Sequence, residues 1–233
     1  MIPAPEFELE GRNLRPDGQG IWHNIFHNSL LSVSAAPIYH SAPCIGYVVQ
    51  ESPTPGKMDM ALYRPHLLRN KAPMSLLGQL QAGQTLTLAD NTVLEPPPRR
   101  HGRKVVILGD TYDPSPIVPL ADRADILIHE ATNAHLPGVD PATKPDESDA
   151  FVEARTKSRG HSTPQMAGAF ARRINARKLV LNHFSARYSG NDDVDDEART
   201  VMEAIRDLAK LTYGSQDVLC ARDWMSIEVD KPA

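Results

Sequence analysis

The chain has little cysteine and no long hydrophobic run. Two of its 233 residues are cysteine, Cys44 and Cys220, and they form no CxxC pair, which excludes a disulfide framework. No apolar segment approaches the roughly 18 residues that a membrane-spanning helix needs. Segment 1–18 carries acids and has no apolar core, unlike a secretory signal or a transit peptide. We therefore predict a nuclear or cytoplasmic protein with no membrane partner, a mitochondrial location being left open.

The chain also has no strong excess of charge of one sign. Its 25 Lys and Arg against 29 Asp and Glu give a net charge of −4, so any nucleic-acid binding has to come from a local basic patch. Hydrophobic residues make up 41% and charged residues 23%, which is typical of a soluble globular protein and excludes wholesale disorder. The length is enough for one good-sized domain.

Four short apolar runs each end at residues that can bind a metal. The runs and the residues that follow them are 33–39 with His40, 104–108 with Asp110, 125–128 with His129 and Glu130, and 178–181 with Asn182 and His183. Runs of this length that are rich in Val and Ile predict strands buried on both faces. Because residues just past strand ends line the ligand crevice of α/β proteins, we expect these side chains to converge.

Helices are predicted between these strands. Segment 162–175 begins with Ser162 and Gln165 at capping-box spacing, and segment 195–211 opens with acids and has Lys210 in its last turn. Segment 216–229 predicts two short strands around a turn. The pattern as a whole indicates the α/β class.

Residues 51–101 contain many prolines, so we expect no long regular element there. The charged residues between positions 57 and 71 sum to +3 in a chain that is negative overall; they are Lys57, Asp59, Arg64, Arg69 and Lys71. Two interpretations stay open at this point. These charges are either those of a solvated loop or those of a protruding arm that holds phosphates.

His40, Asp110 and His183 are separated by 70 and 73 residues, so only tertiary folding can bring them together. Two imidazoles and a carboxylate suit zinc or a similar borderline metal. An aspartate that bridges two ions suits a two-metal hydrolase. The alternative is that each histidine is a loop residue with local hydrogen bonds.

Four further residues could complete such a site. His161 precedes the predicted helix 162–175 and could donate a proton to a leaving alkoxide, with Glu130 orienting it. Arg187 could form a bidentate contact with a phosphate, and Ser185 beside it offers a hydroxyl.

Several segments together resemble short-form ribonuclease Z, the tRNA 3′-processing endonuclease of the metallo-β-lactamase superfamily. The segments are PIYHSAPCIGYVVQE (37–51), GRKVVILGDT (102–111), DILIHEAT (125–132), RGHSTPQMAGAFA (159–171) and KLVLNHFSARY (178–188). They occur in the order of the C-terminal two-thirds of that family. The resemblance runs from about residue 30 to residue 229.

The resemblance implies a fold and a set of roles. The fold is an αββα sandwich, here N-terminally truncated with an incomplete first half, so that residues 1–233 form a partial domain with residues 51–80 as a basic arm-like insertion. His40, Asp110 and His183 fall on metal-ligand positions, with two zinc ions per complete site. The resemblance also implies that His161 protonates the leaving group and that Glu130 supports His161. Ser185 and Arg187 fall on positions that contact the scissile phosphate. The residues implied to clamp the tRNA are Lys57, Arg64, Arg69 and Lys71. The implied partners are precursor tRNA and a second copy of the chain.

The sequence departs from the family in one respect that bears on chemistry. The HxHxDH motif, which supplies further metal ligands in the family, occurs nowhere in the 233 residues. Three interpretations follow: a zinc endoribonuclease that is weak or inactive as this chain, a non-catalytic fragment or pseudoenzyme that binds RNA or a homologous subunit, and another hydrolase of the superfamily.

Overall fold

The computed structural model describes residues 11–144, 146–190 and 192–230. The chain divides into two compact units. The larger one, called here the sheet unit, contains the described residues up to Gln50 and then Lys104–Glu228. The small unit contains Glu51–Arg103 and the described residues from Val229 on. The predicted arm, residues 51–80, lies within the small unit.

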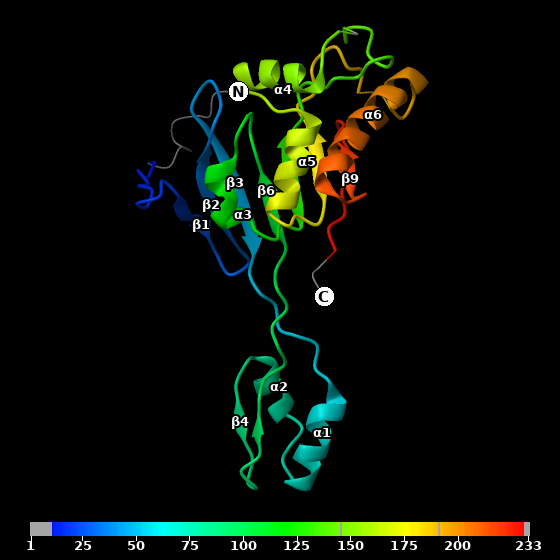
Figure 1. The fold of residues 1–233 in the computed structure, drawn as a ribbon. Helices are drawn as coiled ribbons and strands as arrows, with labels where there is room; N and C mark the ends of the chain where they lie inside the picture. Colours follow the sequence, from blue (N-terminus) through cyan, green and yellow to red (C-terminus); the bar gives the residue numbers. More distant parts are fainter. Residues whose placement is uncertain (1–10, 145, 191, 231–233) are drawn as a thin grey trace, which may run out of the picture. The chain divides into compact units, whose positions relative to one another are not determined.

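The sheet unit is organised around a seven-stranded sheet in the order β1-β2-β3-β6-β7-β8-β9 (Figure 1). The strands are β1 Trp22–His27, β2 Leu31–Ile38, β3 Cys44–Glu51, β6 Lys104–Ile107, β7 Ile126–Glu130, β8 Leu179–Asn182 and β9 Val218–Cys220. Strand β3 runs antiparallel to β6, whereas β6, β7, β8 and β9 are parallel. Strands β6, β7 and β8 correspond to the apolar runs 104–108, 125–128 and 178–181, and their carboxyl ends share one edge of the sheet.

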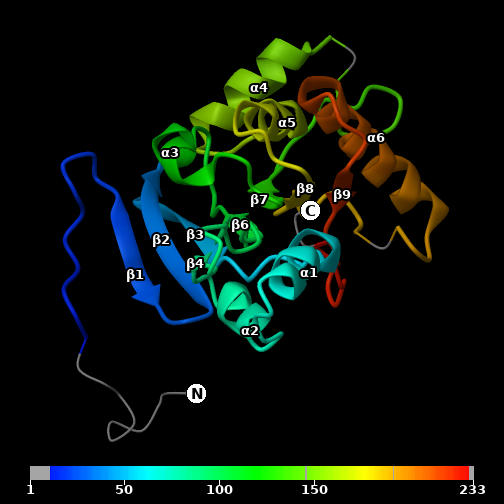
Figure 2. The same cartoon turned by 90° about the horizontal axis from the view of Figure 1, so that it is seen from below.

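Helices cover one face of this sheet, as Figure 2 shows for α3, α5 and α6. The helices are α3 Val118–Ala121, preceded by a 3₁₀ turn over Ser115–Ile117, α4 Asp149–Ser158, α5 Pro164–Arg173 and α6 Asp196–Tyr213. Helix α5 packs on β7 and β8, and α6 packs on α5 and β9. Leu127, Leu179 and Ile205 are fully buried in the core between them. The predicted α/β class is therefore confirmed. Among the residues that the model describes, no helix combines the length and the apolar character needed to cross a bilayer.

The small unit has its own core. It contains α1 Met60–Arg69, α2 Leu76–Gln81, and a two-stranded sheet of β4 Leu86–Thr87 and β5 Val93–Leu94. Its buried side chains are Tyr63, Leu67, Leu80, Leu88 and Leu94.

The expectation of no long regular element in residues 51–101 is wrong, because α1 has ten residues and contains Pro65. A proline inside a helix costs about 3 kcal/mol. The Asp59 side chain caps the helix by accepting from the Ala61 amide, and the helix buries Tyr63 and Leu67. Tertiary burial offsets the local cost of Pro65.

Two further expectations need correction. Segment 216–229 forms a single strand, β9, followed by a turn in which Trp224 is fully exposed with a φ of +64°. The cap of α5 is Thr163 instead of Ser162, because the Ser162 hydroxyl donates to the Thr111 carbonyl and is not free to cap. Strand β3 and helix α4 are not predicted by the sequence patterns.

Candidate metal centre

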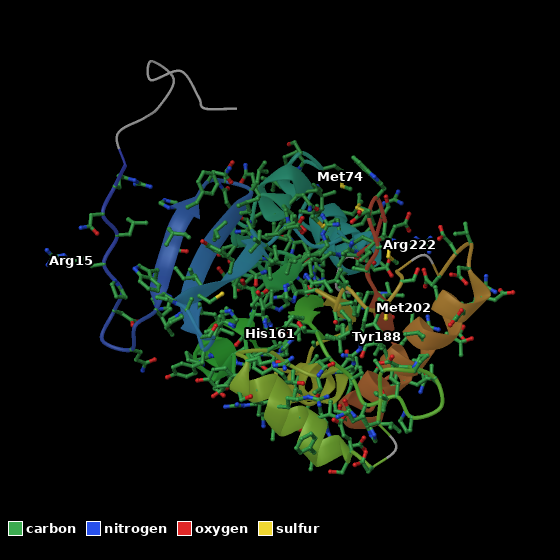
Figure 3. All side chains as sticks on the ribbon, turned by 90° about the horizontal axis from the view of Figure 1, so that it is seen from above. Arg15, Met74, His161, Tyr188, Met202 and Arg222 are labelled. Carbon is green, nitrogen blue, oxygen red and sulfur yellow. The ribbon has the colours of Figure 1, made fainter. Side chains whose placement is uncertain are left out.

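The predicted site residues gather at the carboxyl edge of the sheet. Asp110 follows β6, Glu130 ends β7, and His183 directly follows β8. His40 comes two residues after β2, and His161, labelled in Figure 3, precedes α5. Because β6, β7 and β8 are parallel, their ends place three of these side chains side by side.

Three imidazoles form a row along this edge. The ring centroids of His40 and His161 are 5.0 Å apart, and those of His161 and His183 are 5.2 Å apart. Nε2 of His183 lies 3.4 Å from a carboxylate oxygen of Asp110. Residues far apart in sequence thus meet in space, with His161 between His40 and His183.

The side chains form two groups whose potential ligand atoms all lie within 4.8 Å of one another. The first group is His40, Asp110 and His161, and the second is Glu130, His161 and His183. The predicted ligand trio of His40, Asp110 and His183 is therefore distributed over both groups, and His161 belongs to each. Imidazole nitrogens and a carboxylate are a donor set that suits a borderline divalent metal, so these residues could hold one.

His40 is oriented by the backbone of Gly160. Its Nδ1 lies 2.7 Å from the Gly160 carbonyl oxygen, and since a carbonyl can only accept, Nδ1 carries the proton. Nε2 then has the free lone pair, with the Ser41 hydroxyl 3.2 Å away. A metal-binding histidine typically has its second nitrogen fixed in this way.

His161 and His183 are oriented by Glu130 and Thr132. Nδ1 of His161 is 3.1 Å and 3.2 Å from the two Glu130 carboxylate oxygens, so it donates to them. Nδ1 of His183 is 2.7 Å from the Thr132 hydroxyl, which itself donates to Glu130. Both rings consequently point Nε2 away from Glu130. In that orientation Nε2 can bind a metal or transfer a proton.

Glu130 holds the other residues together. Its side chain is 1% exposed, and besides His161 and Thr132 it accepts hydrogen bonds from the backbone amides of Thr111 at 2.6 Å and Ser162 at 3.1 Å. These donors use the lone pairs of both oxygens, so Glu130 is poorly suited to ligate an ion directly. The geometry fits the orienting role expected for it.

Two backbone features support the ring positions. His183 has a φ of +55°, a left-handed conformation that is uncommon for a residue with a side chain, and its carbonyl oxygen lies 3.0 Å from the Thr132 hydroxyl oxygen. Gly160 has a φ of +90°, and a Cβ there would lie 2.5 Å from Nδ1 of His40. Glycine is therefore the residue that lets His40 approach.

Sequence reasoning missed Thr132 and Gly160. Both lie inside segments that were singled out, DILIHEAT and RGHSTPQ, so a signal existed. Their roles are visible only in space, because they act on histidines that are 51 and 120 positions away.

His129 was one of the strand-end residues and lies outside the centre. It is fully buried, and its ring is tilted against Phe170 with centroids 5.8 Å apart. Burial lowers the pKa of His129 below its ordinary value, which keeps it neutral. Its neighbour Glu130 points to the other side of the strand, as alternation along β7 requires.

Ser185 and Arg187 line a small pocket of about 70 Å³ together with Thr132, Asn133, Thr156, Arg159 and His161. The Arg187 guanidinium is engaged within the protein, since its Nε donates to Asp140 at 2.9 Å and its Nη2 to the Ala134 carbonyl at 3.3 Å and to the Tyr188 hydroxyl. The structure therefore brings both residues next to His161 and ties one of them to a buried acid.

The four basic residues of the predicted arm lie in the small unit. Arg64 and Arg69 are on α1, Lys57 precedes it and Lys71 follows it, and all four are exposed. Arg69 pairs with Asp90 at 2.8 Å. Hydrogen bonds from Thr92, Asn70 and Arg69 hold the pKa of the Asp90 carboxyl well below its usual range.

Comparison with known proteins relates the chain to one group. The ribonuclease Z of Lactobacillus gasseri is 36% identical over 188 residues, which is 78% of this chain and 55% of that protein. The human zinc phosphodiesterase ELAC protein 1 is 30% identical over 239 aligned positions, 97% of this chain and 59% of that protein. Over the part that it spans, the chain belongs to the ribonuclease Z family.

The ribonuclease Z-type chain spans about half the length of the curated relatives that it matches. The crystal structure of human tRNase Z, short form, is 25% identical with a TM-score of 0.49, and the match covers 91% of this chain and 48% of that one. No family model matches the sequence.

The Gly160 contact gives a testable prediction. We expect Gly160→Ala to displace the His40 ring, because the added Cβ would lie 2.5 Å from Nδ1. The positive φ adds about 1–3 kcal/mol of backbone strain. NMR shifts of the His40 imidazole and the midpoint of urea unfolding measure the two effects.

Gly138→Ala is the matched control, since Gly138 also has a positive φ of +78° but has no atom within 4 Å of an added Cβ. It should lower stability similarly and leave the His40 signals in place. Unchanged His40 signals in Gly160→Ala would show that the glycine does not set the ring position.

Proposed function

We propose that this chain is a zinc-dependent endoribonuclease of the ribonuclease Z type, which removes 3′ trailers from tRNA precursors and is weak or inactive in isolation. The observation that carries the proposal is the row of three imidazoles beside Asp110, each with Nδ1 tied to the protein and Nε2 left for chemistry. Histidines whose Nδ1 is hydrogen-bonded to the protein and whose Nε2 is free are typical of a metal or proton-transfer site.

His40, Asp110 and His183 would hold the metal. Bound zinc supplies Lewis-acid activation and neutralises charge on the phosphate. The chain's own contribution is orientation. Gly160 fixes the ring of His40, and Thr132 fixes the ring of His183. The free Nε2 atoms are therefore oriented before a ligand binds.

His161 would act as the proton donor to the leaving oxygen. Its Nδ1 is held by Glu130, so a proton on Nε2 faces away from the core. Glu130 thus acts as a positioning residue for His161.

The substrate would lie over the pocket lined by Ser185 and Arg187, with the small unit as a second contact. The domain assignment belongs to the same proposal: residues 1–233 act as one partial metallo-β-lactamase domain, and residues 51–80 act as the basic arm that binds tRNA through Lys57, Arg64, Arg69 and Lys71. A second copy of the chain is the proposed protein partner. Two cysteines that form no disulfide framework favour a nuclear or cytoplasmic location.

A second candidate is a non-catalytic fragment or pseudoenzyme that binds RNA or a homologous subunit. The absence of HxHxDH from the sequence favours it, because three or four ligands cannot complete two zinc sites. Elemental analysis separates the candidates, since about two zinc ions per chain would exclude the second one.

Thr132→Val tests the metal site. Valine keeps the shape and removes the hydroxyl that connects His183 to Glu130, so zinc affinity should fall about 10–100-fold. Competition with a chromophoric chelator measures it. Thr200→Val, which removes an exposed hydroxyl on α6, should change nothing. Equal affinity in both variants would contradict the proposed role of His183.

Cleavage of a 3′-extended precursor tRNA tests the reaction. We expect slow cleavage that a chelator abolishes, and a loss of about 10²–10⁴-fold in His161→Gln because general acid catalysis is removed. His27→Gln, an exposed histidine of β1, is the matched control. Cleavage that persists in the chelator argues against a metal mechanism.

Charge reversal tests the arm. Lys57→Glu, Arg64→Glu and Lys71→Glu together should weaken tRNA binding and lower its salt dependence, while Arg69 is kept because it pairs with Asp90. The control is a triple variant with the same charge change in the sheet unit, Arg15→Glu, Lys144→Glu and Arg172→Glu. Hydrolysis of a small phosphodiester should stay the same in the arm variant. Equal losses on both substrates would refute the arm hypothesis.

A further inference from the structure

The small pocket beside His161 is lined by two arginines whose surroundings differ. Arg187 comes from the segment after β8, and Arg159 is the C-cap residue that follows α4. Ser185 lines the same pocket. A pocket of about 70 Å³ next to a proposed proton donor has room for a small anionic group and little more.

The charge of Arg187 is largely neutralised within the protein. Its partner Asp140 is 6% exposed, and the pair is 2.9 Å long. A charge pair with a buried carboxylate is costly to break, because the acid would remain without a counter-charge. Arg187 therefore stabilises the wall of the pocket between residues 134 and 188.

Arg159 has no such partner. Within the described residues its guanidinium makes no hydrogen bond or ion pair with another side chain or with the backbone, and the residue is exposed. It is the residue of the pocket that brings an uncompensated positive charge.

The backbone under Arg159 is nevertheless fixed on both sides. The Arg159 amide bonds the Thr156 carbonyl at 3.1 Å, the His161 amide bonds the same carbonyl at 3.1 Å, and the Gly160 carbonyl accepts from His40. A free guanidinium on an ordered turn loses little backbone entropy when it binds a ligand.

We propose that Arg159 binds a phosphate of the substrate beside the scissile bond, and that it, instead of Arg187, supplies the positive charge of the pocket. The inference rests on the proposed function for the identity of the substrate, a phosphodiester chain. A guanidinium matches phosphate oxygens in a bidentate geometry, and the Ser185 hydroxyl offers a further donor. Arg187 keeps the pocket in shape.

Binding of the 3′-extended precursor tRNA in the presence of a chelator tests the proposal without requiring cleavage. We expect Arg159→Gln to weaken binding about tenfold, as for loss of one charge-assisted contact. The slope of log affinity against log salt should fall by about one. Arg159→Lys should restore part of the affinity, because it keeps the charge and loses the bidentate geometry. Fluorescence anisotropy measures all three quantities.

Arg172→Gln is the matched control, an exposed arginine on α5 with no side-chain partner among the described residues. It should change affinity less than twofold. Urea unfolding should give the same midpoint for both glutamine variants. Equal affinities of Arg159→Gln and Arg172→Gln, or no binding of the RNA by the native chain, would overturn the inference. Binding that depends on Arg159 in a chain that never cleaves the precursor would support it and count against the proposed reaction alone.

Discussion

The candidate centre depends on one buried carboxylate. Glu130 receives donors from three separate segments: the Thr111 amide after β6, the Thr132 hydroxyl after β7, and the Ser162 amide with His161 before α5. Each of these donors fixes a part of the chain that carries a site residue. The distances between the imidazoles therefore follow from the hydrogen bonds of a residue that is not itself well placed to bind a metal.

The energetics explain why such a carboxylate tolerates its environment. Moving a charge out of water costs several kcal/mol, and the cost is offset only when the remaining lone pairs are satisfied. Glu130 meets this condition with backbone amides, which cannot move away without unfolding the strand ends. The same amides would remain without a hydrogen-bond acceptor if the carboxylate were lost. Replacing Glu130 would therefore destabilise the whole hydrogen-bond network.

Part of this arrangement is readable from the sequence. The positions of His40, Asp110, Glu130 and His183 after short apolar runs predict convergence, because residues just past strand ends line the ligand crevice of α/β proteins. The pairing of each Nδ1 is not readable, since Gly160 and Thr132 act across 120 and 51 positions. Helix α1 was missed for a different reason: local rules disfavour Pro65, and only the burial of Tyr63 and Leu67 compensates for it. The buried partner Asp140 likewise distinguishes Arg187 from Arg159, and the two arginines look equivalent in sequence.

The number of donors sets a limit on what the described residues can hold. After Glu130 has used its lone pairs on the protein, the centre offers Nε2 of three histidines and the carboxylate of Asp110. If His161 is reserved for proton transfer, three donors remain, His40, Asp110 and His183, which are too few to complete two zinc sites. The family pattern supplies the additional ligands through HxHxDH, which this sequence lacks. The orientation of the three histidines is thus set within the described residues, because Glu130, Thr132 and Gly160 hold the three rings by hydrogen bonds to Nδ1.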